Sequence, residues 1–444
     1  MKKTKKLMTT LIPMCLTLLI MIIIYAGYIL LFKDNNKAFL ENVESSTYAN
    51  ITYYSIYGIH LNIEGNINIE ETLNTIALVL TNGKTEIEIP ATFEQEENKY
   101  TFKTSEKINE GINLETIPQE ELFLLIKGKD SDDKTYYYSV ENKTQYKDLE
   151  YYTISKNNKN NKINIEWNTE DICPTLKFTV KETVLPDNVY DITIDPGHDA
   201  FDSGAIVCVE NNQILTTSNC NRENQYRENV LNLKVSLALK DQLEKMGYKV
   251  AMTRDDEEDL VEIYETGGSA LLANDTKSKF NLAIHHNASG VPGGDKYLNG
   301  LELYVAGNID FTLSRLFVNN ITQEAKISTS PKTKYLSENG IYQRFFTEEE
   351  ILEDDVQPSN KDTNTIYYYY IREVGGINTH ATNDGRYIPE YPKNPYYNSN
   401  QTAESYLFEL GYIDNIEDLN NINNNRDGYA LGIAKSIKEY LNNK

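Results

Sequence analysis

Histidine and glutamate side chains stand at the ends of apolar segments in the second half of the chain. ITIDPGHD ends a short strand at His198, AIHHNAS ends another at His285 and His286, and Glu409 interrupts the apolar run ESYLFELG. Glu228 opens an amphipathic helix, where the helix dipole stabilises a carboxylate. Two imidazoles and one carboxylate are a ligand set suited to Zn²⁺ with a fourth position left for water, and a second carboxylate could take that water's proton. These residue types predict metal-dependent hydrolysis.

The segments that carry these residues alternate between strand and helix patterns after Val189. We expect strands at 192–195, 248–254, 281–287, 301–306 and 405–410, and helices at 228–246, 269–274, 313–324 and 429–441. Such alternation is typical of an α/β domain with a mostly parallel, twisted sheet flanked by helices. Sites in these domains lie along the carboxyl edge of the sheet, so we expect the predicted ligands to meet there.

The first half of the chain has a different organisation. Lysines within the first six residues precede an uncharged stretch over 7–32, long enough to cross a bilayer as a helix. The positive-inside rule then leaves 1–6 in the cytoplasm as a short tail and the rest outside, with a cleaved signal peptide as the alternative. After a linker at 33–46, alternating runs over 47–183 predict an all-β, sandwich-like accessory domain of antiparallel strands.

The charge and the cysteines exclude several functions. A formal net charge of −23, with no basic patch beyond the N-terminal lysines, argues against nucleic-acid binding. Four cysteines without a CxxC pair are too few and too scattered for a disulfide scaffold or a cysteine zinc site. Cys208 and Cys220 flank one loop, and they either pair in an oxidising compartment or remain free thiols.

Five blocks of the second half resemble zinc-dependent N-acetylmuramoyl-L-alanine amidases of the type-3 family. They are ITIDPGHDAFDSGA, the helix led by REN, MTRDDEED, AIHHNAS and FELGYIDN, and they occur in the family's order over residues 187–444. The resemblance implies cleavage of the amide between the lactyl group of N-acetylmuramic acid and the first L-alanine of the peptidoglycan stem peptide. It also implies that His198, Glu228 and His285 hold the zinc and that Glu409 is the catalytic carboxylate. His285 rather than His286 aligns with the family's histidine.

The sequence departs from the family pattern at three places. The loop between His198 and Glu228 is longer, Ser269 stands where an arginine is usual, and a Tyr-rich insertion over about 330–400 precedes Glu409. The insertion is interpreted as a substrate platform, as a lid that a protein activator would displace, or as a plain surface excursion. The candidate substrate contacts are Arg254, Asn287, His380 and Arg386, with a structural ion pair as the alternative for Arg254 and solvated loop residues as the alternative for the last two.

These observations together predict a membrane-anchored zinc amidase whose catalytic domain lies on the cell-wall side of the membrane. The expected cofactor is Zn²⁺, and the expected partners are peptidoglycan and, through the N-terminal helix, the membrane. One alternative is another zinc hydrolase on the same scaffold, such as a peptidase. The other is a catalytically silent amidase-like module that binds the wall.

Overall fold

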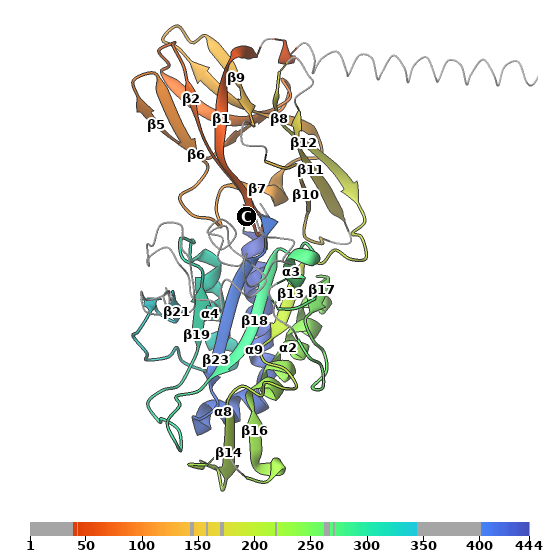
Figure 1. Cartoon of the computed structure of the whole chain (residues 1–444), viewed down its shortest axis with the longest axis vertical. Coiled ribbons are helices and arrows are strands. Elements are labelled where there is room, and N and C mark those ends of the chain that lie inside the picture. The colour runs from red at the N-terminus through yellow and green to blue at the C-terminus, as the bar shows by residue number, and fades with distance from the viewer. Residues whose placement is uncertain are drawn as a thin grey trace, which may run out of the picture.

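The computed structural model describes residues 39–41, 43–142, 146–156, 159–168, 173–217, 220–261, 267–269, 271–343 and 401–443. Two regions follow one another along the long axis of the molecule (Figure 1). A β-rich region comes from the first half of the sequence, and an α/β region comes from the second half.

The β-rich region is one continuous network of hydrogen-bonded strands. Its described strands are β1 (Glu44–Tyr57), β2 (His60–Asn68), β3 (Thr75–Thr81), β4 (Glu86–Ile89), β5 (Thr92–Glu96), β6 (Lys99–Lys103), β7 (Ile112–Asn113), β8 (Glu121–Lys129), β9 (Thr135–Glu141), β10 (Leu149–Tyr152), β11 (Asn160–Asn168) and β12 (Thr175–Thr183), with a 3₁₀ turn η1 (Leu114–Thr116) after β7. Most neighbouring strands are antiparallel, but β1 and β9 run parallel. Because β1 is long, separate parts of it pair with β2, with β9 and with β22 (Gln401–Thr402) of the second half. The predicted antiparallel sandwich is therefore corrected to one network that β1 joins together.

The α/β region is built around a sheet whose central strands are parallel. β17 (Val250–Met252), β13 (Ile192–Pro196), β18 (Phe280–Asn287) and β23 (Glu404–Tyr412) lie side by side in this order and run in the same direction. β19 (Glu302–Val305) continues the sheet antiparallel to β23, and β21 (Ile341–Tyr342) and β20 (Leu336–Glu338) follow it. The central strands are buried, which explains why they are continuous apolar runs in the sequence.

Three helices pack together beside this sheet. α2 (Glu228–Lys245) packs on β13 and β18, and α9 (Arg426–Asn442) lies between α2 and α4 (Thr312–Ala325). Two shorter helices, α3 (Leu272–Asp275) and α8 (Ile416–Asn424), also belong to this region. The predicted apolar stripe of α2 is buried against the core, and it consists of Leu231, Val235, Leu239 and Leu243.

The fold prediction also included one transmembrane helix, and this part is corrected. No helix within the described ranges is long and apolar enough to span a bilayer. The stretch 7–32, for which that helix was predicted, lies outside these ranges.

The β-rich region is docked on the amino-terminal edge of the parallel strands. Tyr57, Ile59 and Ile154 belong to the same hydrophobic cluster as the core of the α/β region. Polar contacts cross the same boundary, since Asn109 donates to the buried carboxylate of Glu404 at 2.9 Å. This edge is opposite the carboxyl edge of the same strands, where the site is predicted (Figure 1).

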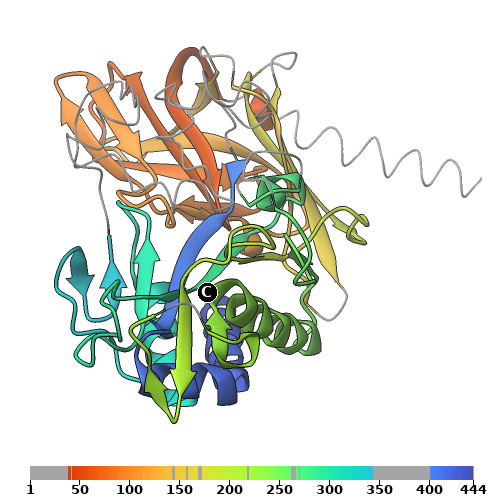
Figure 2. The same ribbon diagram turned by 60° about the horizontal axis from the view of Figure 1, so that its bottom comes forward.

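The loop predicted between β13 and α2 is instead a small β-sheet arm. It contains β14 (Ile206–Glu210), β15 (Gln213–Ile214), a 3₁₀ turn η2 (Arg222–Asn224) and β16 (Gln225–Arg227), with the strand order β15-β14-β16. A disulfide joins Cys208 to Cys220, so of the two predicted alternatives the structure has the paired cysteines and not the free thiols. The arm projects from the end of the molecule opposite the β-rich region, as the two views show (Figures 1 and 2).

Candidate active site

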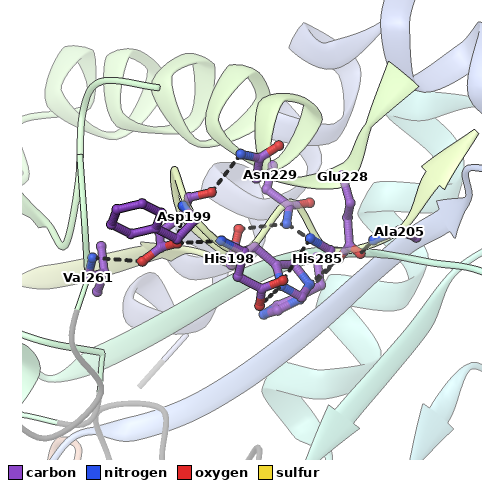
Figure 3. Close-up of polar contacts among 12 residues, drawn as sticks. His198, Asp199, Ala205, Glu228, Asn229, Val261 and His285 are labelled. Carbon is purple, nitrogen blue, oxygen red and sulfur yellow. Dashed lines mark hydrogen bonds and ion pairs between the residues drawn. The ribbon is translucent and has the colours of Figure 1, made fainter. Parts of the chain in front are cut away.

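The ends of three neighbouring strands bring the predicted residues into one pocket. His198 follows β13, and His285 of β18 stands beside Glu409 of β23 because the two are direct partners in the sheet register. Glu228 is the first residue of α2 and reaches the same point from the helix (Figure 3). The four side chains line a pocket of about 240 Å³ at the carboxyl edge of the parallel strands.

The carboxylate of Glu228 lies between the two histidines. Its Oε1 atom is 3.1 Å from Nε2 of His198 and 3.2 Å from Nδ1 of His285. Its Oε2 atom accepts a hydrogen bond of 2.9 Å from the backbone amide of Ala205, which fixes the orientation of the carboxylate. Burial tends to raise the pKa of Glu228, but the hydrogen bonds from both imidazoles outweigh it and lower the pKa well below its usual range.

Two glycines make room for these side chains. A Cβ atom on Gly197 would lie 2.2 Å from the ring of His285, and one on Gly204 would lie 2.5 Å from Oε2 of Glu228. Gly204 also has a left-handed φ of +60°, which glycine adopts at little cost. The glycine of the PGH turn is therefore required by the close approach of an imidazole rather than by its own backbone angle.

His198 is oriented by an acidic neighbour four residues further along the chain. Its Nδ1 atom is 2.7 Å from Oδ2 of Asp202, which leaves Nε2 directed at Glu228. Burial tends to lower the pKa of His198, but Glu228 and Asp202 together raise it to about 9. Asp199, the residue next to His198, accepts backbone hydrogen bonds in its loop, including one from Val261 (Figure 3).

His286 lies on the other side of β18 and has a different environment. It is buried, and its Nδ1 atom is 2.6 Å from Oδ1 of Asn232, whose amide donates to the carbonyl of Gly197 at 2.9 Å. Burial lowers the pKa of His286 to about 3, so this imidazole is neutral. Sequence reasoning missed Asn232, although a polar residue one turn after Glu228, beside the apolar stripe of α2, was a usable signal.

Glu409 lines the pocket, and one of its two carboxylate oxygens has no hydrogen-bond partner among the described residues. Its Oε2 atom is buried and makes no hydrogen bond within the described part of the chain. Burial, and then the nearby charges of Glu228 and Glu302, raise the pKa of the Glu409 carboxyl well above its usual range. A carboxylate with a raised pKa is a stronger base than an exposed one, which suits a group that must take up a proton and later release it.

A second buried carboxylate, Glu302, stands opposite Glu409 on the neighbouring strand and was not predicted. The two residues are register partners across β19 and β23. The Glu302 side chain accepts hydrogen bonds from Asn287 (3.2 Å), Tyr304 (2.8 Å), Ser330 (2.8 Å), Lys332 (3.0 Å) and Tyr412. Its charge is thereby compensated, and Glu302 anchors the wall of the pocket beside Glu409.

The four candidate substrate contacts have different positions. Arg254 is 2% exposed and donates to the carbonyls of Pro196, Gly197 and Asn229, so it braces the loop that carries His198 and does not face the pocket. Asn287 lines the pocket. His380, Arg386 and most of the predicted platform or lid lie outside the described residues.

Ser269 occupies the position where the family usually has an arginine. Its hydroxyl donates to Oδ1 of Asp195 at 3.0 Å, and Thr253 donates to the same oxygen at 2.6 Å. With serine instead of arginine at position 269, the Asp195 carboxylate therefore still has hydrogen-bond partners, and these lie behind the site.

Comparison with known proteins agrees with this arrangement. The model of the N-acetylmuramoyl-L-alanine amidase family matches residues 192–439, more than half of the chain. No curated protein matches the chain significantly.

Several solved structures are similar to the second half of the chain. The catalytic domain of CwlV, an N-acetylmuramoyl-L-alanine amidase from Bacillus (Paenibacillus) polymyxa var. colistinus, is 20% identical over 58% of this chain and 100% of that chain, with a TM-score of 0.36. An N-acetylmuramoyl-L-alanine amidase from Clostridium difficile 630 is 18% identical over 58% of this chain and 100% of that chain, with a TM-score of 0.35. The CwlD amidase from Clostridioides difficile, solved in complex with the GerS lipoprotein, is 15% identical over 57% of this chain and 100% of that chain, with a TM-score of 0.33.

The pocket at the end of a parallel sheet and the family match define the class of protein. The chain belongs to the type-3 family of N-acetylmuramoyl-L-alanine amidases, which confirms the resemblance found in the sequence. Its second half carries the hydrolase domain.

Proposed function

We propose that this protein is a zinc-dependent amidase that cleaves the bond between N-acetylmuramic acid and the first L-alanine of the stem peptide in peptidoglycan. The observation that supports it best is the cluster of His198, Glu228 and His285 in the same pocket as Glu409. Membership of the amidase family supports the type of reaction and the substrate.

The donor atoms of the cluster fit a zinc ion. One ligand atom from each of His198, Glu228 and His285 lies within 4.8 Å of the other two, and Glu228 Oε1 is closer still to both nitrogens. Zinc ligands at about 2.0–2.1 Å in a tetrahedral site are roughly 3.3–3.4 Å apart. Three ligands of nitrogen and carboxylate type are common in catalytic zinc sites, where the fourth position stays open.

The residues of the chain would divide the reaction between them. Bound zinc would supply Lewis acidity, which activates a water and polarises the substrate carbonyl. Glu409 accepts the proton of the attacking water on its carboxylate, holds it because its pKa is raised, and then donates it to the leaving amide nitrogen. Asp202 and Ala205 keep His198 and Glu228 in their orientations.

We infer that the enzyme works on the cell-wall side of the membrane. Peptidoglycan is outside the cytoplasm, and disulfides such as Cys208–Cys220 persist in oxidising compartments. Protein isolated from the native cell and alkylated under denaturing conditions should gain label on these two cysteines only after reduction. Labelling of both without reduction would contradict this location.

Digestion of purified peptidoglycan tests the bond that is cleaved. The full-length protein with zinc should release new amino termini on L-alanine alone, in amounts equal to the muramic acid lactyl groups set free. New amino termini on other stem residues would indicate a zinc peptidase. Binding to the wall without any new amino terminus would indicate a catalytically silent module.

A further inference from the structure

A second hollow opens beside the pocket that holds Glu409. It has a volume of about 280 Å³, and we call it the arm cleft because one wall is the arm, over residues 205–207 and 214–217. The other wall is the loop over residues 288–294 together with Asp414. Ala205 and Ala288 line both the arm cleft and the active-site pocket, so the two hollows adjoin at these residues.

Both walls of the arm cleft are held in position. The disulfide of Cys208 ties β14 to the chain before β16, and Asn420 of α8 donates to Oδ1 of Asn212 at the tip of the arm at 3.0 Å. The opposite wall is anchored by Asp414, whose carboxylate accepts the backbone amide of Ser289. The arm cleft is therefore a formed groove before any ligand arrives.

The chemistry of the lining fits a peptide better than a sugar. The described residues that line the cleft include no aromatic side chain and no basic one, and the carboxylate of Asp414 already accepts hydrogen bonds from Ser289. What remains is aliphatic side chains of different sizes, threonine hydroxyls and the backbone of three glycines. Sugar rings usually pack on aromatic faces, whereas aliphatic walls accept the apolar side chains of a peptide, such as the methyl group of alanine.

The edge of the arm sheet gives a second argument for a peptide. In the order β15-β14-β16, β15 is an edge strand of the described arm, and Ile214 of β15 lines the cleft together with Leu215 and Thr216, which directly follow the strand. An edge strand can bind an extended peptide through main-chain hydrogen bonds. The stem peptide of the proposed substrate is a short peptide attached directly to the scissile amide.

We propose that the arm cleft is the binding site for the stem peptide beyond its first alanine. This inference rests on the proposed amidase function and extends it to the part of the substrate that decides affinity. Ligand sites usually measure about 300–1,000 Å³, a range that neither the pocket nor the cleft reaches alone but that the two reach together. The longer loop between His198 and Glu228 thereby has a role in recognising the substrate.

Two tryptophan variants test the cleft from its opposite walls. Thr216→Trp and Val291→Trp would each fill the cleft, and both residues are exposed, so neither change disturbs the core. Glu210→Trp is the matched control, because Glu210 is exposed on the same arm outside the cleft. Hydrolysis by the full-length zinc protein is measured on muramoyl-L-alanine and on a muramoyl tripeptide, each with one sugar and with several.

The expected result is a loss that depends on the length of the peptide. Both cleft variants should lower kcat/KM on the tripeptide substrates at least tenfold, mainly through KM, and should match the unaltered protein on muramoyl-L-alanine. The control should match the unaltered protein on every substrate. A loss equal on all substrates, or one that grows with the number of sugars, would overturn the proposal.

A binding measurement separates this proposal from the amidase itself. If the unaltered protein hydrolyses none of these substrates, the proposed function is refuted. Calorimetric measurement of muramoyl tripeptide binding then tests whether the cleft binds the peptide. Binding that weakens at least tenfold in Thr216→Trp and Val291→Trp, but not in Glu210→Trp, would support the cleft. Equal binding by all four proteins would refute it.

Discussion

Asn232 links the proposed metal ligands to the loop that carries His198. Its side-chain amide nitrogen donates to the carbonyl of Gly197 and lies 3.4 Å from Oε1 of Glu228. Its Oδ1 atom contacts Nδ1 of His286. Asn232→Leu should therefore lower the free energy of unfolding by about 2–4 kcal/mol, because two buried polar groups lose their partners. It should also weaken zinc binding about 10–100-fold, as is usual for residues that orient ligands.

Urea unfolding and zinc titration measure these two effects. Lys234→Leu, at an exposed position of the same helix, is the control and should change both quantities little. Unaltered zinc affinity in Asn232→Leu would show that Glu228 and the histidines need no support from this amide.

Arg254 gives a prediction of a different kind, since sequence reasoning left its role open between substrate contact and structure. Its guanidinium is buried on three backbone carbonyls. Arg254→Met should lower the free energy of unfolding by about 2–4 kcal/mol, because those carbonyls lose charged donors. KM for soluble muramoyl peptides should change less than twofold at a temperature where the variant is folded. A raised KM with normal stability would restore the substrate role.

The meeting of the four proposed site residues in one pocket could be predicted, and the contacts that orient them could not. His198, His285 and Glu409 end strands, and Glu228 begins a helix, so the topology alone brings them to one edge. Asp202, Asn232 and Glu302 act through contacts that depend on side-chain direction across separate elements. For Asp202 and Glu302 nothing in the local sequence specifies those directions, whereas the helical spacing of Asn232 from Glu228 was a signal.

The arm is the element whose stability depends most on one covalent bond. Cys208 and Cys220 are 12 residues apart, and closing a loop of that length stabilises it by about 3 kcal/mol in the chain-entropy account. The double variant Cys208→Ser, Cys220→Ser should lose amide protection within residues 205–227, while the parallel strands keep theirs. Hydrogen exchange measures both.

A reductant provides the control for the arm. Added to the unaltered protein, the reductant should cause the same loss of amide protection in the arm as the double variant shows. Added to the double variant, it should change the amide protection very little. Equal protection of the arm with and without the disulfide would show that β14, β15 and β16 suffice to hold it.

Elements with a long pattern were predicted well, and the arm was not. The apolar stripe of α2 and the apolar run of β18 predicted the bounds of these two elements to within a few residues of those in the structure. The arm was predicted as a polar loop because its strands are short. A signal was present, since Asn211 and Asn212 both have left-handed φ angles and form the two-residue turn of a hairpin.

At the scale of the whole molecule, the β-rich region and the α/β region share one interface. Glu150 of β10 accepts hydrogen bonds from Lys277 of the α/β region at 2.6 Å and from Tyr152, and forms an ion pair with Lys162. Burial tends to raise the pKa of Glu150, but these partners lower it to about 2. Its contribution to stability is therefore full above about pH 4.5 and is lost as the pH falls towards 2.

Glu150→Gln tests this interface. The variant should be less stable than the unaltered protein by up to about 1 kcal/mol at pH 7, because Glu150 is partly exposed and its ion pairs are screened by solvent. The difference should shrink between pH 4.5 and pH 2, as followed by urea unfolding. A difference that stays constant over this range would mean that the charge of Glu150 contributes nothing.

The division of the chain was predicted from the change of period after Val189, but the shared core was not. Tyr57, Ile59 and Ile154 look like ordinary residues of a separate β domain, and only the fold brings them against the α/β core. The β1–β22 pair likewise joins residues more than 340 positions apart, which no local pattern can indicate. We therefore expect the second half alone to be less stable than the full chain.

The central claim is that Glu409 transfers the proton while His198, Glu228 and His285 hold a single zinc. The most direct test is the full-length Glu409→Gln variant, measured for zinc content and for release of L-alanine amino termini from peptidoglycan. We predict one zinc per chain in both proteins and a loss of about 10²–10⁴-fold in hydrolysis rate, the usual contribution of a general acid and base. Normal hydrolysis in the variant, or loss of zinc together with activity, would contradict this assignment of roles.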